Sequence, residues 1–399
     1  MLNEKKALRT DELRLGMYVV ELDRPWLGTS FPFQGFPLTS EAQLEELRAC
    51  CKSVFVDPDR ETWTPESRST TLPQHGSTVY TDAVPVEKEL PAAREIYRTC
   101  EHELSQLLTT MRAEGDIDAE SLAGAVSSMV GSIQRSPGAI LLLNAVRSKG
   151  SYELARAMDT SILMVAFGRF LQYPAARLEV LGLAGSLLDV GTTLLPEPRA
   201  GGGEEDGLDD AVAESHVLHS VELIRAARGL PPRVDEVVIE HHERQDGEGY
   251  PYGLTTDQIS TDGAIAAIVD SFSRLTSLRA RGGQLSASRA LSLLYKQRGS
   301  ALHAALVEQF IQCIGVYPVG GGVELNTGEA GLVIAQNPVR RLSPRVMIMR
   351  DAAGSPVYPH RILDLMQEPL GPSGEPYRIR RALPRDQVHI GAGDLLVGE

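Results

Sequence analysis

Residues 240–254 read Glu-His-His-Glu-Arg-Gln-Asp-Gly-Glu-Gly-Tyr-Pro-Tyr-Gly-Leu. The residues just before and at the start of this stretch repeat at the spacing of one helix face: Val234, Val237, Val238 and His241. We therefore expect a buried helix that brings His241 into the interior, with His242 beside it. Two neutral imidazoles in such a place suit a divalent transition metal. Two histidines in ordinary hydrogen bonds would give the same pair.

The residues after the histidine pair favour a tight, irregular loop. Aspartate, glycine and proline are typical of turns, and such a loop exposes backbone N–H groups to a ligand or a partner. The residues concerned are Asp246, Gly247, Gly249, Tyr250 and Pro251. The complete string, from the two histidines through Gly-Tyr-Pro to Gly-Leu, resembles the signature of the HD-GYP family. Members of this family, part of the HD phosphohydrolase superfamily, are metal-dependent phosphodiesterases that hydrolyse cyclic di-GMP in bacteria.

The resemblance implies a mostly α protein with an all-helical HD-type bundle, a small N-terminal α+β domain and a short C-terminal β segment. It also implies a set of metal ligands, which by position are Asp189, His216, His241, His242 and Asp270. In the family, the aspartate at position 189 bridges two metals and so takes part in catalysis. The loop at residues 246–251 belongs to the surface where these domains meet ligand or partner proteins.

Three positions depart from the family pattern. The family has His-Asp, one residue, Gly and Lys, whereas this chain has Leu188 and Thr192 in place of the histidine and the lysine. Counting back from Gly168-Arg169 places Arg156 where the family has its upstream metal-ligating histidine. The His-Asp motif is therefore degenerate.

Arg156 has two possible roles. An arginine stays protonated and cannot bind a metal, but it can replace a missing metal's charge by pairing with Asp189 or Asp270. It can also pair with Asp159 three residues on, as a solvated contact on the helix surface. Asp189 follows an apolar helix face and lies at the negative end of the helix dipole, so we expect a positive group beside it.

The metal set that remains complete consists of Asp189, His216, His241 and His242. These nitrogen and oxygen donors suit at most one Fe, Mn or Zn ion. Three functions stay open: a degenerate protein that binds cyclic di-GMP, a related nucleotide or a signalling partner with little hydrolysis; an active phosphodiesterase that yields pGpG or GMP; and a scaffold for protein contacts. Loss of one of two metals would remove most of the rate, which favours the first.

The composition shifts along the chain predict five segments. These are a small α+β domain at 1–65, a Ser/Thr/Pro-rich linker at 66–84, a connecting helix at 85–117, a helical domain at 118–316, which the resemblance identifies as the HD-GYP domain, and a β-rich segment at 317–399. The first segment resembles a domain of unknown function common in front of HD-GYP domains. The residues at 15–19, 23–26 and 31–36 carry that resemblance.

Individual elements follow from local patterns. We expect strands at 18–22 and 53–57 around a helix at 40–50, and strands at 332–334 and 345–349 after a Gly-rich turn at 320–328. The helix within 85–117 has an apolar stripe formed by Ile96, Cys100, Leu104, Leu107 and Leu108. This stripe suits packing within the domain and a seam with a partner, including a homodimer, equally well.

The composition limits the partners. The 399 residues carry a net charge of −14, which disfavours a nucleic-acid polymer as the main partner. No apolar run reaches the roughly 20 residues of a membrane span, and no signal peptide is evident. The four cysteines form no CxxC pair, which is typical of a reducing cytoplasm. We therefore expect a cytoplasmic protein.

Overall fold

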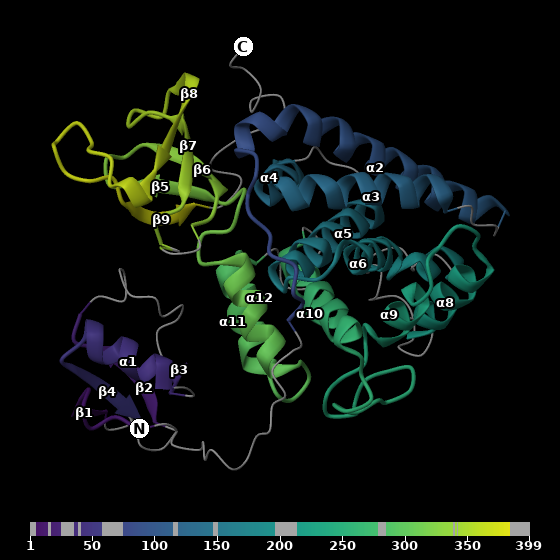
Figure 1. The fold of residues 1–399 in the computed structure, drawn as a ribbon, viewed down its shortest axis with the longest axis horizontal. Helices are drawn as coiled ribbons and strands as arrows, with labels where there is room; N and C mark the ends of the chain where they lie inside the picture. The colour runs from purple at the N-terminus through teal and green to yellow at the C-terminus, as the bar shows by residue number, and fades with distance from the viewer. Residues whose placement is uncertain are drawn as a thin grey trace, which may run out of the picture. The chain divides into compact units, whose positions relative to one another are not determined.

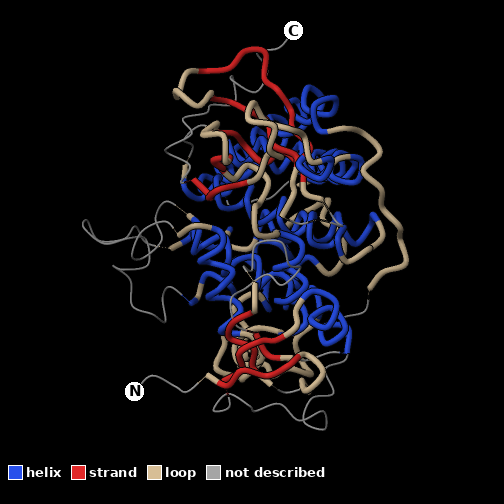
Figure 2. The backbone as a smooth tube through the Cα atoms, turned by 90° about the vertical axis from the view of Figure 1, so that its left-hand side faces the viewer, coloured by secondary structure: helices blue, strands red, loops and turns tan. Residues whose placement is uncertain are grey.

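The computed structural model describes residues 5–14, 17–24, 36–38, 41–57, 75–114, 119–146, 151–195, 214–277, 285–337, 340 and 342–383. The chain forms two compact units. The first contains Met1–Thr71 with Pro338–Leu342, and the second contains Leu72–Asn337 with Ser343–Glu399. Figure 2 shows helices as the main structure, with the strands gathered in two separate sheets. The predicted mostly α fold with a small sheet towards each end is confirmed.

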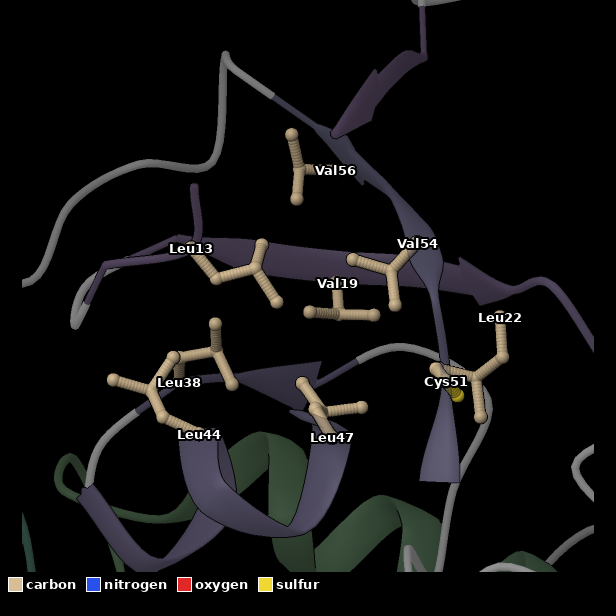
Figure 3. Packing of buried hydrophobic residues seen from close by; sticks show 9 residues of the cluster. All are labelled: Leu13, Val19, Leu22, Leu38, Leu44, Leu47, Cys51, Val54 and Val56. Atoms are coloured by element: carbon tan, nitrogen blue, oxygen red, sulfur yellow. The ribbon is translucent and has the colours of Figure 1, made fainter. Parts of the chain in front are cut away.

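The first unit is a four-stranded antiparallel sheet with one helix. Its strands are β1 (Lys6–Arg9), β2 (Tyr18–Leu22), β3 (Phe36–Pro37) and β4 (Ser53–Asp57), in the order β1-β4-β2-β3, and its helix is α1 (Glu41–Cys50). Leu44 and Leu47 of the helix face Val19 and Val54 of the sheet (Figure 3), and all four are almost fully buried. The strands and the helix predicted here are confirmed, except for Ser40, which lies outside the described residues.

The second unit begins with an extended segment and a long helix. Residues 75–84, the described part of the predicted linker, run along the end of α5 (Tyr152–Phe170), where the Tyr80 hydroxyl donates to the Tyr173 carbonyl at 2.6 Å. The long helix α2 (Val86–Glu114) packs against α3 (Glu120–Arg135) and α4 (Pro137–Val146) (Figure 1). Cys100, Leu104 and Leu107 are buried in this contact. The apolar stripe therefore packs within the domain.

The remaining helices form the bundle that carries the candidate site. They are α5, α6 (Ala175–Leu187), the short 3-10 helix η3 (Val190–Leu194), α8 (His216–Ala226), α9 (Val234–Glu240), α10 (Thr261–Thr276), α11 (Ala287–Gln297) and α12 (Ala304–Ile314). The α5 and α6 backbones approach closely because Gly185 has no side chain: a Cβ there would lie 2.8 Å from the Ser161 Cα. The α10 helix packs against α5 and α9. These contacts bring α5, α9, α10 and the end of α6 to one place.

A five-stranded antiparallel sheet closes the second unit. Its strands are β5 (Gly322–Leu325), β6 (Ala330–Ala335), β7 (Arg345–Arg350), β8 (Pro356–Asp364) and β9 (Ile379–Leu383), in the order β8-β7-β6-β5-β9. A 3-10 turn, η4 (Leu365–Gln367), follows β8. The predicted strands at 332–334 and 345–349 are confirmed as parts of β6 and β7.

The prediction of a continuous turn at 320–328 was wrong. Val323 and Leu325 alternate with Glu324 and are buried as strand β5, because this short segment pairs with β6 on one side and β9 on the other. Turns lie on both sides of this strand, at residues 319–320 and after Leu325. Among the described residues, no helix has the length and apolar character needed to cross a membrane.

Candidate metal centre

Four predicted ligands meet in the helical bundle. Asp189 follows α6, His216 begins α8, and His241 and His242 follow α9. One ligand atom from each of these residues lies within 4.8 Å of the others. The Nε2 atoms of His216 and His241 lie 3.4 and 3.7 Å from the Asp189 Oδ1. The predicted helix face is confirmed, since Val234, Val237, Val238 and His241 are all buried.

His241 and His242 each place one ring nitrogen toward the cluster. The Nδ1 atom of His241 lies 2.5 Å from the Val238 carbonyl oxygen, which can only accept, so Nδ1 carries a proton and Nε2 is the ring nitrogen that faces Asp189. Burial and the neighbouring histidines lower the pKa of His242 well below its ordinary value. The His242 Nε2 is buried without a hydrogen-bond partner among the described residues. A buried, neutral nitrogen of this kind fits a metal ion.

Arg156 lies beside the cluster and joins two carboxylates. Its Nη2 atom donates to the Asp189 Oδ2 at 2.5 Å and to the Asp270 Oδ1 at 2.5 Å. The Arg156 side chain is 9% exposed and that of Asp270 is 3% exposed. Asp159, the alternative partner, instead accepts a hydrogen bond from Asn144 at 2.6 Å. The expectation of a positive group beside Asp189 is confirmed, and the surface interpretation of Arg156 was wrong.

The charges of this triad stabilise one another. Burial alone lowers the pKa of Arg156, but Asp189 and Asp270 raise it above its ordinary value. Burial alone raises the pKa of Asp189, but Arg156 and the contacts with His216 and His241 hold it well below its ordinary value. A guanidinium therefore occupies the space between the two carboxylates. A second metal does not fit there, because it would meet this fixed positive charge.

Asp270 is the predicted ligand that does not join the cluster. It lies on α10 and bonds Arg156, with the Arg274 Nη1 4.0 Å from its other oxygen. Leu188 is 1% exposed, as its apolar helix face predicts. The Thr192 hydroxyl donates to the Asp189 backbone carbonyl at 2.6 Å and caps the turn of η3. Neither substituted position therefore supplies the donor or the cation of the family pattern.

Ser220 on α8 makes contacts beside the candidate site that the sequence did not indicate. Its hydroxyl donates to the Leu188 carbonyl at 3.0 Å and accepts from the Gly191 N–H at 2.7 Å. A Cβ at Gly191 would lie 2.1 Å from the His216 carbonyl oxygen. The serine and the glycine thus hold α8 against the turn that carries Asp189, which fixes the separation of two ligands.

Glu240 and Glu243 flank the histidine pair and were also missed. The Glu240 Oε2 accepts from the backbone N–H and the hydroxyl of Ser260 at 2.9 and 2.5 Å, which fixes the start of α10. The buried Glu243 accepts the backbone N–H groups of Tyr252 and Leu254 at 2.7 and 2.8 Å. Both carboxylates orient the segments around the histidines. Their place in the histidine motif was the available signal.

The loop residues predicted to meet ligand or partner form a compact turn. The Tyr250 ring stacks on the His242 ring with centroids 4.7 Å apart. Asp246 accepts from Arg244 at 2.9 and 2.6 Å. Gly247 has a φ of +78°, and a Cβ at Gly249 would lie 2.4 Å from a backbone nitrogen. Pro251 follows Tyr250 in the half-buried part of the loop. The loop therefore packs against His242, one of the predicted ligands.

Three histidines and an aspartate meet at one centre of the helical bundle, a donor set that could hold a metal ion. The sequence comparisons agree: residues 141–306 match the HD domain family, residues 5–122 match the domain of unknown function DUF3391, and residues 322–370 match the KOW domain associated with HD domain. The chain thus contains an HD domain with a DUF3391 domain in front of it, as the resemblance implied.

Known proteins are similar over different lengths. Cyclic di-GMP phosphodiesterase PA4108 of Pseudomonas aeruginosa is 28% identical over 371 residues, which cover 90% of this chain and 89% of the relative. The 3'3'-cGAMP-specific phosphodiesterase 2 of Vibrio cholerae is 27% identical over 43% of this chain and 33% of its own. A solved structure of Bd1817, an HDG"Y"P protein from Bdellovibrio bacteriovorus, covers 77% of this chain and 98% of its own with a TM-score of 0.46 and 16% identity.

Proposed function

We propose that this protein is a degenerate HD-GYP protein of bacterial cyclic di-GMP signalling, which binds at most one divalent metal ion and a cyclic dinucleotide with little hydrolysis. The observation that carries the proposal is the double contact of Arg156 with Asp189 and Asp270. Asp189, His216, His241 and His242 would hold an Fe, Mn or Zn ion. A bound ion of this kind supplies Lewis acidity and activates water.

The residues of this chain provide only part of what hydrolysis requires. Phosphodiester cleavage by a two-metal site uses a second positive centre on the developing charge. Arg156 carries such a charge, but its Nη2 is committed to two carboxylates and its side chain is buried. Thr192, which stands in place of the family's lysine, carries no charge, and its hydroxyl donates to the Asp189 backbone carbonyl. Binding without turnover therefore suits this site better than catalysis.

The runner-up is an active phosphodiesterase that yields pGpG or GMP. The resemblance to PA4108 over 89% of that protein favours it, because that relative is named as a cyclic di-GMP phosphodiesterase. The relatives from Vibrio cholerae named for 3'3'-cGAMP make that nucleotide a second substrate to test. A third role is contact with a signalling partner protein through the Gly-Tyr-Pro loop, where Tyr252 is 62% exposed.

Metal analysis and nucleotide assays together test the proposal. We expect at most one specifically bound ion per chain, binding of cyclic di-GMP or 3'3'-cGAMP, and little turnover of either by the metal-loaded protein. The control is His241→Ala, which removes a ligand. Turnover that this variant abolishes would establish the runner-up, because a contaminating enzyme would not respond to the substitution. Absence of both metal and nucleotide binding would leave the scaffold role.

A further inference from the structure

Asp189 presents one carboxylate oxygen to the histidines of the candidate metal centre. Its Oδ1 atom lies 3.4 Å from the His216 Nε2 and 3.7 Å from the His241 Nε2. Its Oδ2 atom instead accepts a hydrogen bond of 2.5 Å from the Arg156 Nη2. A carboxylate can bind a metal ion through one oxygen or through both. The contact with Arg156 leaves only one oxygen of Asp189 for the metal.

Arg156 is itself held in place. Its Nη2 atom also donates to the Asp270 Oδ1 at 2.5 Å, and the Arg156 side chain is 9% exposed. A rotation of Asp189 that turned both oxygens to the histidines would break a charge-assisted hydrogen bond. Because Arg156 is buried, little water could replace the lost partner. The one-oxygen arrangement is therefore built into the packing of the domain.

Among the described residues, four donor atoms meet at this centre, one from Asp189 and one from each histidine. His241 places its Nδ1 at the Val238 carbonyl, so its Nε2 is the nitrogen that faces the aspartate. The His242 Nε2 is buried and has no hydrogen-bond partner among the described residues. Zinc takes four nitrogen, oxygen or sulfur donors, whereas manganese suits six donors that are mostly oxygen. The number and the type of donors both favour zinc.

The spacing of the donor atoms also favours zinc. Bonds of about 2.0 to 2.1 Å place neighbouring donors about 3.3 Å apart in a tetrahedron and about 2.9 Å apart in an octahedron. The two separations from the Asp189 Oδ1, 3.4 and 3.7 Å, are closer to the tetrahedral value. The side chains therefore suit a tetrahedral ion without closer approach.

We propose that Arg156 is a positioning residue, which limits Asp189 to one donor atom and so makes this centre a four-donor site that prefers zinc to manganese. The inference rests on the proposed function for the presence of one metal ion, but not for the nucleotide. Zinc sites that catalyse hydrolysis use three protein donors and leave the fourth position to water. Four protein donors fill that position, which gives a second reason for little hydrolysis.

The test measures metal preference and visible absorption of the full-length protein, as wild type and as Arg156→Met. Dissociation constants for Zn²⁺ and Mn²⁺ come from competition with a coloured chelator. Co²⁺ serves as the spectroscopic probe, because it absorbs visible light strongly with four donors and weakly with six. The wild type should give the strong Co²⁺ spectrum. In Arg156→Met more carboxylate oxygens face the ion, so the spectrum should weaken and the preference for zinc over manganese should fall about tenfold.

Two further variants serve as controls. Asp270→Asn removes the other carboxylate but keeps the contact between Arg156 and Asp189, so it should keep the strong Co²⁺ spectrum. Arg169→Leu lies on the same helix as Arg156 and loses only a contact with the exposed Asp82, so its spectrum and metal preference should match wild type. Thermal melting of each metal-loaded variant checks its folding. The wild-type spectrum tests the proposal even if Arg156→Met does not fold.

The outcomes separate this inference from the proposed function. A weak Co²⁺ spectrum in wild type, or an equal zinc-to-manganese preference in wild type and folded Arg156→Met, would overturn the role of Arg156. One bound ion per chain with either result would leave the proposed function in place. A strong spectrum that is lost in Arg156→Met and kept in both controls would support the inference. Absence of any specifically bound ion would count against both proposals.

Discussion

Replacing Arg156 by leucine should make this domain depend on metal for its stability. The substitution leaves two carboxylates facing each other without their cation. Breaking a buried ion pair in this way costs about 3 to 5 kcal/mol of unfolding free energy. Asp270 is 3% exposed and bears most of this cost, whereas Asp189 is 32% exposed and is partly solvated. We therefore expect the unfolding free energy to fall by an amount near the lower end of this range, about 3 kcal/mol.

A divalent ion should restore much of that loss in the variant. An ion present at about 100 times its dissociation constant adds about 2.7 kcal/mol to the native state. The assay is thermal or urea unfolding of wild type and Arg156→Leu, each with a chelator and with added Mn²⁺. The gain from metal should be larger in the variant, because two carboxylates then face the ion in place of the guanidinium.

Arg169→Leu provides the matched control. Arg169 lies on the same helix, its side chain is 13% exposed, and its carboxylate partner Asp82 is 61% exposed. Removal of Arg169 therefore leaves no buried charge beside the metal ligands. If Arg156→Leu and Arg169→Leu lose equal stability and respond equally to metal, the guanidinium does not replace an ion in this site.

Three further predictions address the centre and its loop. Arg156→His combined with Leu188→His should raise metal occupancy measured by elemental analysis. Without metal, the buried imidazole at position 188 should lower the unfolding free energy by about 1 to 3 kcal/mol. An equal fall in melting temperature with and without metal would contradict this prediction. Glu243→Gln should speed hydrogen exchange of the two loop amides that Glu243 binds. Glu248→Gln should not, because the Glu248 side chain is 78% exposed. Equal exchange in the two variants would count against this role of Glu243. Burial lowers the pKa of His242 below 6.5, so the unfolded chain binds more protons than the folded one. The unfolding free energy of the metal-free protein should therefore fall as pH drops below about 6.5. The same dependence of unfolding free energy on pH in His242→Gln would refute this.

The sequence indicated the parts of the site that depend on local pattern. The valine spacing before His241 predicted a buried helix end, and the unfavourable dipole position of Asp189 predicted a nearby cation. Both follow from helix geometry and charge, which operate within a few turns of chain. The choice between the partners of Arg156 required the packing of α5 against α6 and α10, which no local pattern determines.

Other features depend on contacts between distant segments. Ser220 bonds two backbone groups about thirty positions away, and Glu243 accepts two loop amides, so neither role follows from residue type alone. Strand β5 was missed because its glycine-rich surroundings favour a turn, whereas pairing with β6 and β9 overrides that preference. The five predicted segment boundaries stay predictions.

The guanidinium between Asp189 and Asp270 keeps a positive charge at this position when the concentration of transition metals in the cell changes. A cation built into the polypeptide cannot be chelated, displaced by a competing ion or oxidised, whereas an iron centre is exposed to all three. At this position the chain therefore has a charge that does not vary with the transition metals available to the cell. Starvation for metal would empty the histidine centre while the neighbouring carboxylates stayed neutralised and the surrounding helices stayed packed.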